Sequence, residues 1–340
     1  AVISGWVLAY LLQMASGAFV GIDGQGATAV FNDLQSDALG ILAWFTGFMA
    51  LTVWISGRGV GEGLEVAVKY LMPTLFGLLL LLVVWAAFTS GHFMEGFAFL
   101  FSFKAEQFSA DGVLMAMGQA FFTLSLGMGA MMAYGAYLPA GTSIFRSVTA
   151  IALLDTTVAV LAGLAIFPLV FANGLEASAG PGLMFVTLPI AFGQMAGGQL
   201  FGTLFFVLVS FAAITSAISL VEPCLAWLVE KLRVSRMAAA MLIGAVTWVV
   251  GLGSAFSFNI LSDFYLLPGK TYFDTMDFVA NNIILPLGGL LIALFAGWVL
   301  ERSILREQLG EETVITRVWL LLARFVAPAA VGLVFVMALV

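Results

Sequence analysis

Long apolar runs separated by short polar connections dominate the pattern of hydrophobic and polar positions along this chain. A helix needs about 20 mostly apolar residues to cross a bilayer, because a backbone in hydrocarbon must satisfy its own hydrogen bonds. Nine stretches have this character, and the sixth is long enough to hold a re-entrant or loop segment before its helix proper at 198–229. The predicted spans cover approximately residues 1–20, 39–56, 66–88, 112–137, 144–172, 191–229, 236–256, 278–300 and 318–340.

The composition supports a membrane protein. Of the 340 residues, 62% are hydrophobic and 9% are charged, whereas a water-soluble domain is about half apolar and a quarter charged. Unbroken runs such as Gly77 to Val84 argue against the short alternating strands of a β-barrel. No soluble domain interrupts the spans, so we predict an all-α transmembrane protein with one domain over residues 1–340.

Several functional classes are disfavoured by simple counts. The net charge is −7 and no basic stripe exists, so nucleic acid is not an expected partner. His92 is the single histidine, Cys224 is the single cysteine, and no His-Glu-x-x-His pattern occurs. We therefore expect neither an enzyme nor an organic cofactor.

The cations fall in alternate loops. One set of loops carries Arg58, Lys69, Arg146, Lys231, Arg233, Arg236, Arg302, Arg306 and Arg317, and the others carry only Lys104 and Lys270. By the positive-inside rule the first set faces the cytoplasm, so the segment at 21–38 and the C-terminus are external. We expect a multi-pass protein of the plasma (inner) membrane. The chain opens at Ala1 inside an apolar helix, so we also expect it to lack its natural beginning.

The most informative stretch runs from Gly118 to Tyr137 and contains Ser125-Leu-Gly-Met-Gly129 at the middle of a span. Each glycine weakens a helix by roughly 0.5–1 kcal/mol relative to alanine. A helix broken at this depth exposes backbone N–H and C=O groups, which is tolerated only where they line a cavity or bind a ligand. We predict a ligand-binding unwound segment; small residues for close helix packing are the alternative.

Two further features point to a cation. Asp155 lies near the middle of the span at 144–172, where an ionised carboxylate costs about 2.5–3.5 kcal/mol or more. No Lys or Arg is near it at membrane depth, so a bound cation is the expected partner, with a protonated Asp as the alternative. Thr215 and Ser216 offer oxygen ligands of the kind hard cations prefer, although helix hydroxyls also bond back to their own carbonyls.

These three stretches together resemble the neurotransmitter:sodium symporter family, and more narrowly its bacterial hydrophobic amino-acid transporters. The resemblance covers nearly the whole chain, from the family's third helix at Trp6, and is most specific at 118–137, which is similar to its unwound sixth helix. It implies a leucine-transporter-like inverted-repeat fold with about nine helices present, and sodium-coupled symport by alternating access.

The resemblance also implies roles for individual residues. The substrate would contact Phe122, Thr123, Ser125, Met128, Ser216 and Leu220. The first Na⁺ site would use Thr123 and Asp155, and the second the Ala212 carbonyl, Thr215 and Ser216. Gln119 and Asp277 would belong to the external gate with Phe122 as its lid, and Glu230 to the cytoplasmic gate with Tyr137 beside it.

Two departures from the family pattern sharpen these expectations. Many members have Asn where this chain has Asp155, and chloride-dependent members have Ser where it has Ala159. A fixed carboxylate would replace chloride, so we expect chloride-independent transport. Met128 stands where an aromatic residue is frequent, and its flexible thioether between two glycines favours a bulky hydrophobic L-amino acid, aromatic or branched.

The family's first two helices, which supply the rest of both Na⁺ sites, would lie before Ala1. We therefore expect this chain by itself to lack a complete site. The alternative function is a transport-incompetent fragment, or a binding or regulatory membrane protein derived from a transporter. The sequence does not indicate an oligomeric state.

Overall fold

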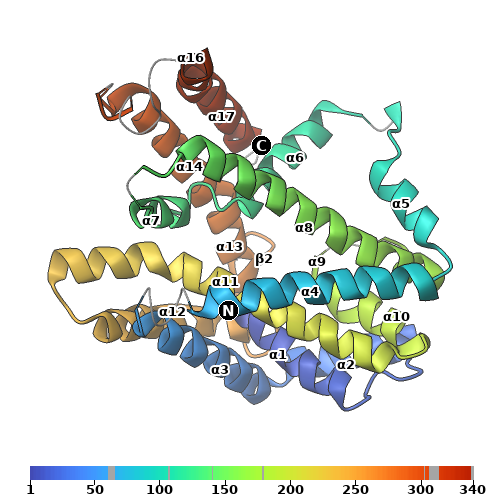
Figure 1. Cartoon of the computed structure of the whole chain (residues 1–340). Coiled ribbons are helices and arrows are strands. Elements are labelled where there is room, and N and C mark those ends of the chain that lie inside the picture. Colours follow the sequence, from blue (N-terminus) through green and yellow to red (C-terminus); the bar gives the residue numbers. More distant parts are fainter. Residues whose placement is uncertain are drawn as a thin grey trace. The chain divides into compact units, whose positions relative to one another are not determined.

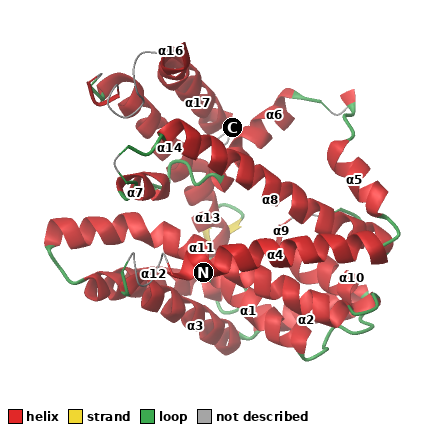
Figure 2. Ribbon diagram, in the orientation of Figure 1, coloured by secondary structure: helices red, strands yellow, loops and turns green. Residues whose placement is uncertain are grey.

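The computed structural model describes residues 1–59, 66–105, 108–139, 141–177, 180–301, 303–305 and 314–337. These residues are mainly helical, with one small β-hairpin (Figure 2). The chain divides into two compact units (Figure 1). Unit 1 comprises Ala1–Phe103 and Val158–Phe273, and unit 2 comprises Lys104–Thr157 and Asp274–Val340.

Unit 1 holds most of the long regular helices. Its elements are α1 (Val2–Ala15), α2 (Gly24–Ser36), α3 (Ala38–Gly57), α4 (Val66–Thr89), α5 (Phe93–Phe101), the second half of α8 (Ile144–Ala172), α9 (Gly180–Gly182), the π-helical turn η3 (Leu183–Thr187), α10 (Leu188–Gln194), α11 (Gly198–Leu232), α12 (Arg236–Phe256), and the hairpin β1 (Tyr265–Leu267) and β2 (Lys270–Thr271). Strands β1 and β2 pair antiparallel, with Tyr265 opposite Thr271.

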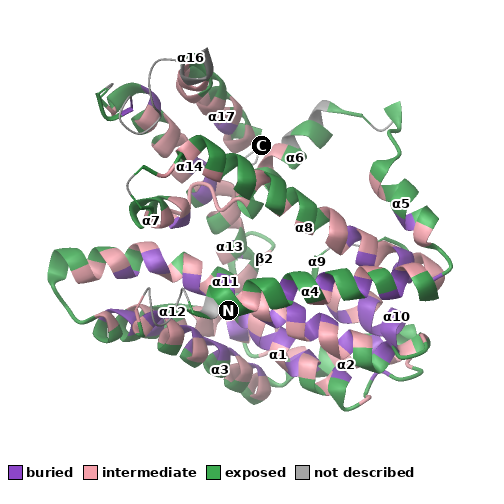
Figure 3. Ribbon diagram, in the orientation of Figure 1, coloured by how far each residue is buried: buried purple, intermediate pink, exposed green. Residues whose placement is uncertain are grey.

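An aromatic core holds unit 1 together. Trp6 and Tyr10 on α1 are almost fully buried, and both contact Phe185 of η3, with ring centroids 5.7 and 4.9 Å away. Figure 3 shows buried backbone, in purple, along α1 and α11. Helix α3 approaches α1 closely because Gly5 has no side chain: a Cβ there would lie 2.9 Å from the Phe45 backbone N. Aromatic burial of this kind dominates core energetics.

Two of the three acidic residues in the segment at 21–38 act as helix caps. The Asp23 carboxylate accepts a hydrogen bond from Gly26 N at 2.7 Å and begins α2. Asp37 accepts one from Gly40 N at 2.9 Å and begins α3. A carboxylate at this position satisfies a helix N–H that has no partner within the helix, so these acids explain why two helices begin where they do.

Unit 2 has shorter and less regular helices. Its elements are α6 (Ala110–Thr123), α7 (Ala130–Ala136), the first half of α8, most of α13 (Tyr272–Phe278), the π-helical turn η4 (Val279–Ile284), α14 (Leu285–Leu294), the π-helical turn η5 (Phe295–Val299), α16 (Val314–Leu321), the π-helical turn η6 (Leu322–Val326) and α17 (Ala327–Met337).

Seven described helices are long and apolar enough to cross a membrane. They are Ala38–Gly57, Val68–Thr89, Ile144–Ala172, Gly198–Leu232, Arg236–Phe256, Tyr272–Val299 and Arg317–Met337. The expected count of about nine is imprecise. Helix α1 has 14 residues because the chain turns at Gly17, where φ is 80°, and the stretch at 112–137 is divided into α6 and α7. The single membrane domain stays a prediction.

Candidate functional site

The predicted break in the stretch at 112–137 is confirmed. Helix α6 ends at Thr123, α7 begins at Ala130, and turns join them (Figure 1). Gly127 and Gly129 have φ of 83° and 82°, which glycine adopts without steric cost. Ser125 has φ of 53°, although it carries a side chain. Strain of this kind persists where the surroundings hold it, and such positions cluster at ligand sites.

The unwound segment lies directly against α14. A Cβ at Gly127 would collide with the Leu285 carbonyl oxygen and lie 2.8 Å from Gly289 N. A Cβ at Gly288 would in turn collide with the Gly127 carbonyl oxygen. Backbones approach this closely only where side chains are absent. Sequence reasoning missed the Gly288-Gly289 pair, because two glycines in an apolar span equally suit ordinary packing.

The residues predicted to contact substrate lie on three segments, α6, the unwound segment and α11. In unit 2, Phe122 is 51% exposed near the end of α6, Thr123 is the exposed last residue of that helix, and Ser125 and Met128 lie half-buried in the unwound segment. In unit 1, Ser216 and Leu220 are exposed on α11, one helical turn apart.

Two of the predicted external gate residues, Gln119 and Phe122, line one cavity within unit 2, and Asp277 is not among its lining residues. The cavity is about 600 Å³ in volume, and Gln119, Phe122, Asn281 and Asn282 contribute to its lining. Asp277 accepts a hydrogen bond from Asn281 Nδ2 at 2.8 Å. Gln119 therefore shares a cavity with the hydrogen-bond partner of Asp277. The two asparagines were missed, although polar amides one turn after Asp277 in an apolar span were a readable signal.

The residues predicted for the second Na⁺ site lie within one turn of α11. The Thr215 hydroxyl lies 3.0 Å from the Ala212 carbonyl oxygen and 3.0 Å from that of Phe211. Thr215 is buried, and Ser216 next to it is exposed. Two oxygens at this separation can bind the same cation if the hydroxyl turns its proton away, although back-bonding alone is an ordinary use of a helical threonine.

The residues predicted for the first Na⁺ site are both in unit 2. Asp155 is half-buried on α8, in the half of that helix that belongs to unit 2. Thr123 makes only a long hydrogen bond, 3.5 Å from its hydroxyl to the Ala120 carbonyl oxygen. The Thr123 hydroxyl is thus weakly engaged by its own helix, which leaves it available to a ligand.

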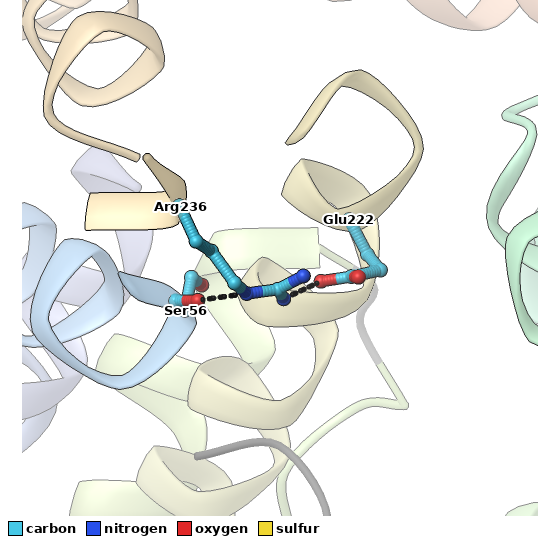
Figure 4. Close-up of polar contacts among 3 residues, drawn as sticks. All are labelled: Ser56, Glu222 and Arg236. Carbon is cyan, nitrogen blue, oxygen red and sulfur yellow. Dashed lines mark hydrogen bonds and ion pairs between the residues drawn. The ribbon is translucent and has the colours of Figure 1, made fainter. Parts of the chain in front are cut away.

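The C-terminal part of α11 carries two acidic residues, and sequence reasoning named only one. Glu230, the predicted gate residue, is exposed near the end of the helix. Glu222 is fully buried and forms an ion pair with Arg236 of α12, with 2.5 Å from Oε2 to Nη2 (Figure 4). Arg236 also donates from Nε to the Ser56 carbonyl oxygen of α3 at 2.9 Å. A buried carboxylate needs such a partner, and this one joins three helices.

Comparison with known proteins identifies the family. The model of the sodium:neurotransmitter symporter family matches residues 30–340. The chain belongs to this family. It is therefore a sodium-dependent symporter and a multi-pass membrane protein rather than an enzyme, as the resemblance implied.

Individual relatives agree with this family. The chain is 38% identical to an uncharacterized sodium-dependent transporter, YhdH, of Bacillus subtilis, over 98% of this chain and 74% of the relative. It is 30% identical to an uncharacterized sodium-dependent transporter of Haemophilus influenzae, with the same coverage of 98% and 74%. The crystal structure of MhsT in complex with L-phenylalanine matches with a TM-score of 0.89 and 40% identity, over 99% of this chain and 77% of that one. The leucine-transporter-like fold class is thereby confirmed.

Proposed function

We propose that this symporter couples Na⁺ entry to uptake of a hydrophobic L-amino acid, aromatic or branched, without a requirement for chloride. The observation that carries the substrate class is the likeness to MhsT, which binds L-phenylalanine and is 40% identical over 99% of this chain. Alternating access would then expose the bound amino acid to each side of the membrane in turn.

The unwound segment supports a bulky substrate. Met128 is half-buried between Gly127 and Gly129, which both have positive φ. A flexible thioether held by two glycines can repack around side chains of different shape. We assign Phe122, Thr123, Ser125, Met128, Ser216 and Leu220 to substrate binding.

The oxygen donors support Na⁺ as the coupling ion. We assign Thr123 and Asp155 to the first Na⁺ site, and Ala212, Thr215 and Ser216 to the second. The 3.0 Å separation between the Thr215 hydroxyl and the Ala212 carbonyl oxygen supports the second assignment. A carboxylate, hydroxyls and a carbonyl are the oxygen ligands that hard cations take.

We assign the gates as the family resemblance implies. Gln119 and Asp277 would close the external side with Phe122 as the lid, supported by the cavity that Gln119, Phe122 and Asn281 line. Glu230 would close the cytoplasmic side with Tyr137 nearby. The cations in alternate loops support an inner-membrane protein with an external C-terminus, which reporter fusions at the C-terminus would test.

Uptake by the full-length protein in proteoliposomes tests the substrate class. An inward Na⁺ gradient should drive accumulation of L-phenylalanine or L-leucine, and unlabelled hydrophobic amino acids should compete. Preference for glycine or a charged amino acid would exclude the proposed substrate. Sodium-dependent binding without uptake would instead favour the alternative of a binding or regulatory protein.

Chloride is tested separately. Asp155 supplies a fixed negative charge on α8, and Ala159 follows it by one helical turn. Replacing chloride with gluconate should leave wild-type uptake unchanged, and Asp155→Asn combined with Ala159→Ser should make uptake chloride-dependent. If wild-type uptake already needs chloride, the carboxylate does not substitute for the anion.

A further inference from the structure

Two π-helical turns face each other in unit 2, at the ends of neighbouring membrane spans. Turn η5 closes the span Tyr272–Val299, and η6 lies early in the span Arg317–Met337. They touch at Gly297, where a Cβ would lie 3.0 Å from the Ala323 carbonyl oxygen and 3.0 Å from Arg324 Cα. π-helical turns of this kind are rare and occur frequently at functional sites.

A side chain of each turn donates a hydrogen bond to a backbone carbonyl oxygen of the other turn. Arg324 donates from Nε to the Gly297 carbonyl oxygen at 2.5 Å, and Trp298 donates from Nε1 to the Arg324 carbonyl oxygen at 3.1 Å. The Arg324 guanidinium carbon also lies 5.8 Å from the centroid of the Trp298 ring. Two hydrogen bonds and a cation–π contact therefore fix the direction of the arginine side chain.

This direction brings the positive charge to the edge of the membrane. Gly297 is two residues before Val299, where its span ends, whereas Arg324 follows the start of its own span, Arg317, by seven residues. Because a Cβ at Gly297 would lie 3.0 Å from Arg324 Cα, the two residues lie at the same level. At 1.5 Å per residue, this level is about 3 Å from the end of the span Tyr272–Val299.

The bound Nε leaves the rest of the guanidinium fork available. Arginine has five N–H donors, and the structure uses one of them here. Among the described residues, no carboxylate lies within ion-pair distance of Arg324, and the one ion pair found there is Arg236 with Glu222. Beside the guanidinium, the Trp298 ring is 58% exposed, as aromatic residues at a membrane interface are. Arg317, also exposed, adds a second cation to this span.

We propose that Arg324, which Gly297 and Trp298 hold in place, binds the phosphate of an anionic phospholipid, with Arg317 adding attraction for the net negative headgroup. A guanidinium fork binds phosphate through two parallel hydrogen bonds, and an interfacial cation gains additional attraction from anionic lipid. The proposal concerns the lipid around the transporter and does not depend on its substrate.

Lipid-dependent thermal unfolding of the full-length protein in detergent tests the site. Phosphatidylglycerol should raise the melting temperature of the wild type more than phosphatidylcholine does. Arg324→Gln should need about tenfold more phosphatidylglycerol for the same response, the loss expected for one charge-assisted interaction. Soluble glycerol phosphate should have no effect, and stabilisation by it would identify a free phosphate site instead.

Two controls separate lipid binding from simple packing. Trp298→Phe removes the indole donor but keeps the ring, so it should lower the melting temperature in both lipids and keep the phosphatidylglycerol response. Arg58→Gln removes a cation that lies 4.0 Å from the Trp54 ring centroid in unit 1. This variant should also keep the phosphatidylglycerol response. If Arg324→Gln also keeps the phosphatidylglycerol response, as Trp298→Phe should, then Arg324 only joins the two turns and the proposal fails. If Arg324→Gln does not fold, Arg324→Lys keeps the charge but loses the planar fork, so it should retain less phosphatidylglycerol on purification than the wild type does. Equal retention would contradict the proposal.

Discussion

The two units of this transporter differ in how their backbones are built. Unit 1 has long regular helices whose large aromatic side chains are fully buried, among them Trp6, Tyr10 and Phe206. Unit 2 has an unwound segment between α6 and α7 and three π-helical turns, η4, η5 and η6. A regular helix satisfies its own backbone, whereas an interrupted helix leaves polar groups to be satisfied by other elements or by ligands. We infer that most of the backbone groups left for other elements or for ligands lie in unit 2.

The largest effect on stability should come from the buried ion pair of unit 1. Glu222→Gln leaves Arg236 without its charge partner, and breaking a buried pair costs about 3–5 kcal/mol. The melting temperature should fall by roughly 5–10 °C in thermal unfolding. Glu230→Gln, on the same helix but exposed, should change it little. Equal melting temperatures for the two variants would show that the ion pair of Glu222 does not stabilise unit 1.

The second largest effect should come from a substitution in the unwound segment of unit 2. Gly127→Ala places a side chain at φ of 83° and against the Leu285 carbonyl oxygen, which should cost about 1–3 kcal/mol and abolish uptake. Gly135→Ala on α7 is the matched control, because a Cβ there meets nothing within 4 Å. It should be neutral or slightly stabilising. Uptake by Gly127→Ala at the wild-type rate would show that the segment tolerates a regular conformation.

A smaller and more specific effect should appear on α11. Thr215→Val removes the hydroxyl that lies 3.0 Å from the Ala212 carbonyl oxygen, so the Na⁺ concentration for half-maximal uptake should rise about tenfold. Thr203→Val removes a hydroxyl that also bonds back to its own helix, at 2.7 Å from the Gln199 carbonyl oxygen. That variant should keep the wild-type Na⁺ dependence. A matching shift in both would indicate a general change in α11 and not loss of a Na⁺ ligand.

The smallest effect should be a gain in stability within the aromatic core. The Tyr10 hydroxyl is buried, and the part of the chain that the structure describes offers it no hydrogen-bond partner. An unpaired buried hydroxyl is costly, so Tyr10→Phe should raise the stability by up to about 1 kcal/mol while keeping the ring contacts with Phe19 and Phe185. Tyr265→Phe at an exposed strand position should be neutral. A clear loss of stability in Tyr10→Phe would show that the hydroxyl has a partner such as a buried water.

The helices and the break in one of them could be predicted because their causes are local. Apolar length specifies a span, and Ser125-Leu-Gly-Met-Gly129 weakens the helix that contains it. The predicted helix at 144–172 coincides with α8, Ile144–Ala172. The end of α1 was placed five residues too late, because Gly17 and its positive φ carry little weight in a hydrophobicity pattern.

Partners distant in sequence could not be predicted in the same way. Gly288 and Gly289 matter because Gly127 lies against them, and Glu222 is tolerated because Arg236 reaches it. In sequence, each of these residues is an ordinary glycine or acid. Apolar length and backbone flexibility belong to a segment by itself, so the amino-acid sequence alone determined the membrane spans and the unwound helix. Contact between segments depends on how the whole chain packs, so only the tertiary structure decided which glycines the unwound segment touches and which charge pairs with Glu222.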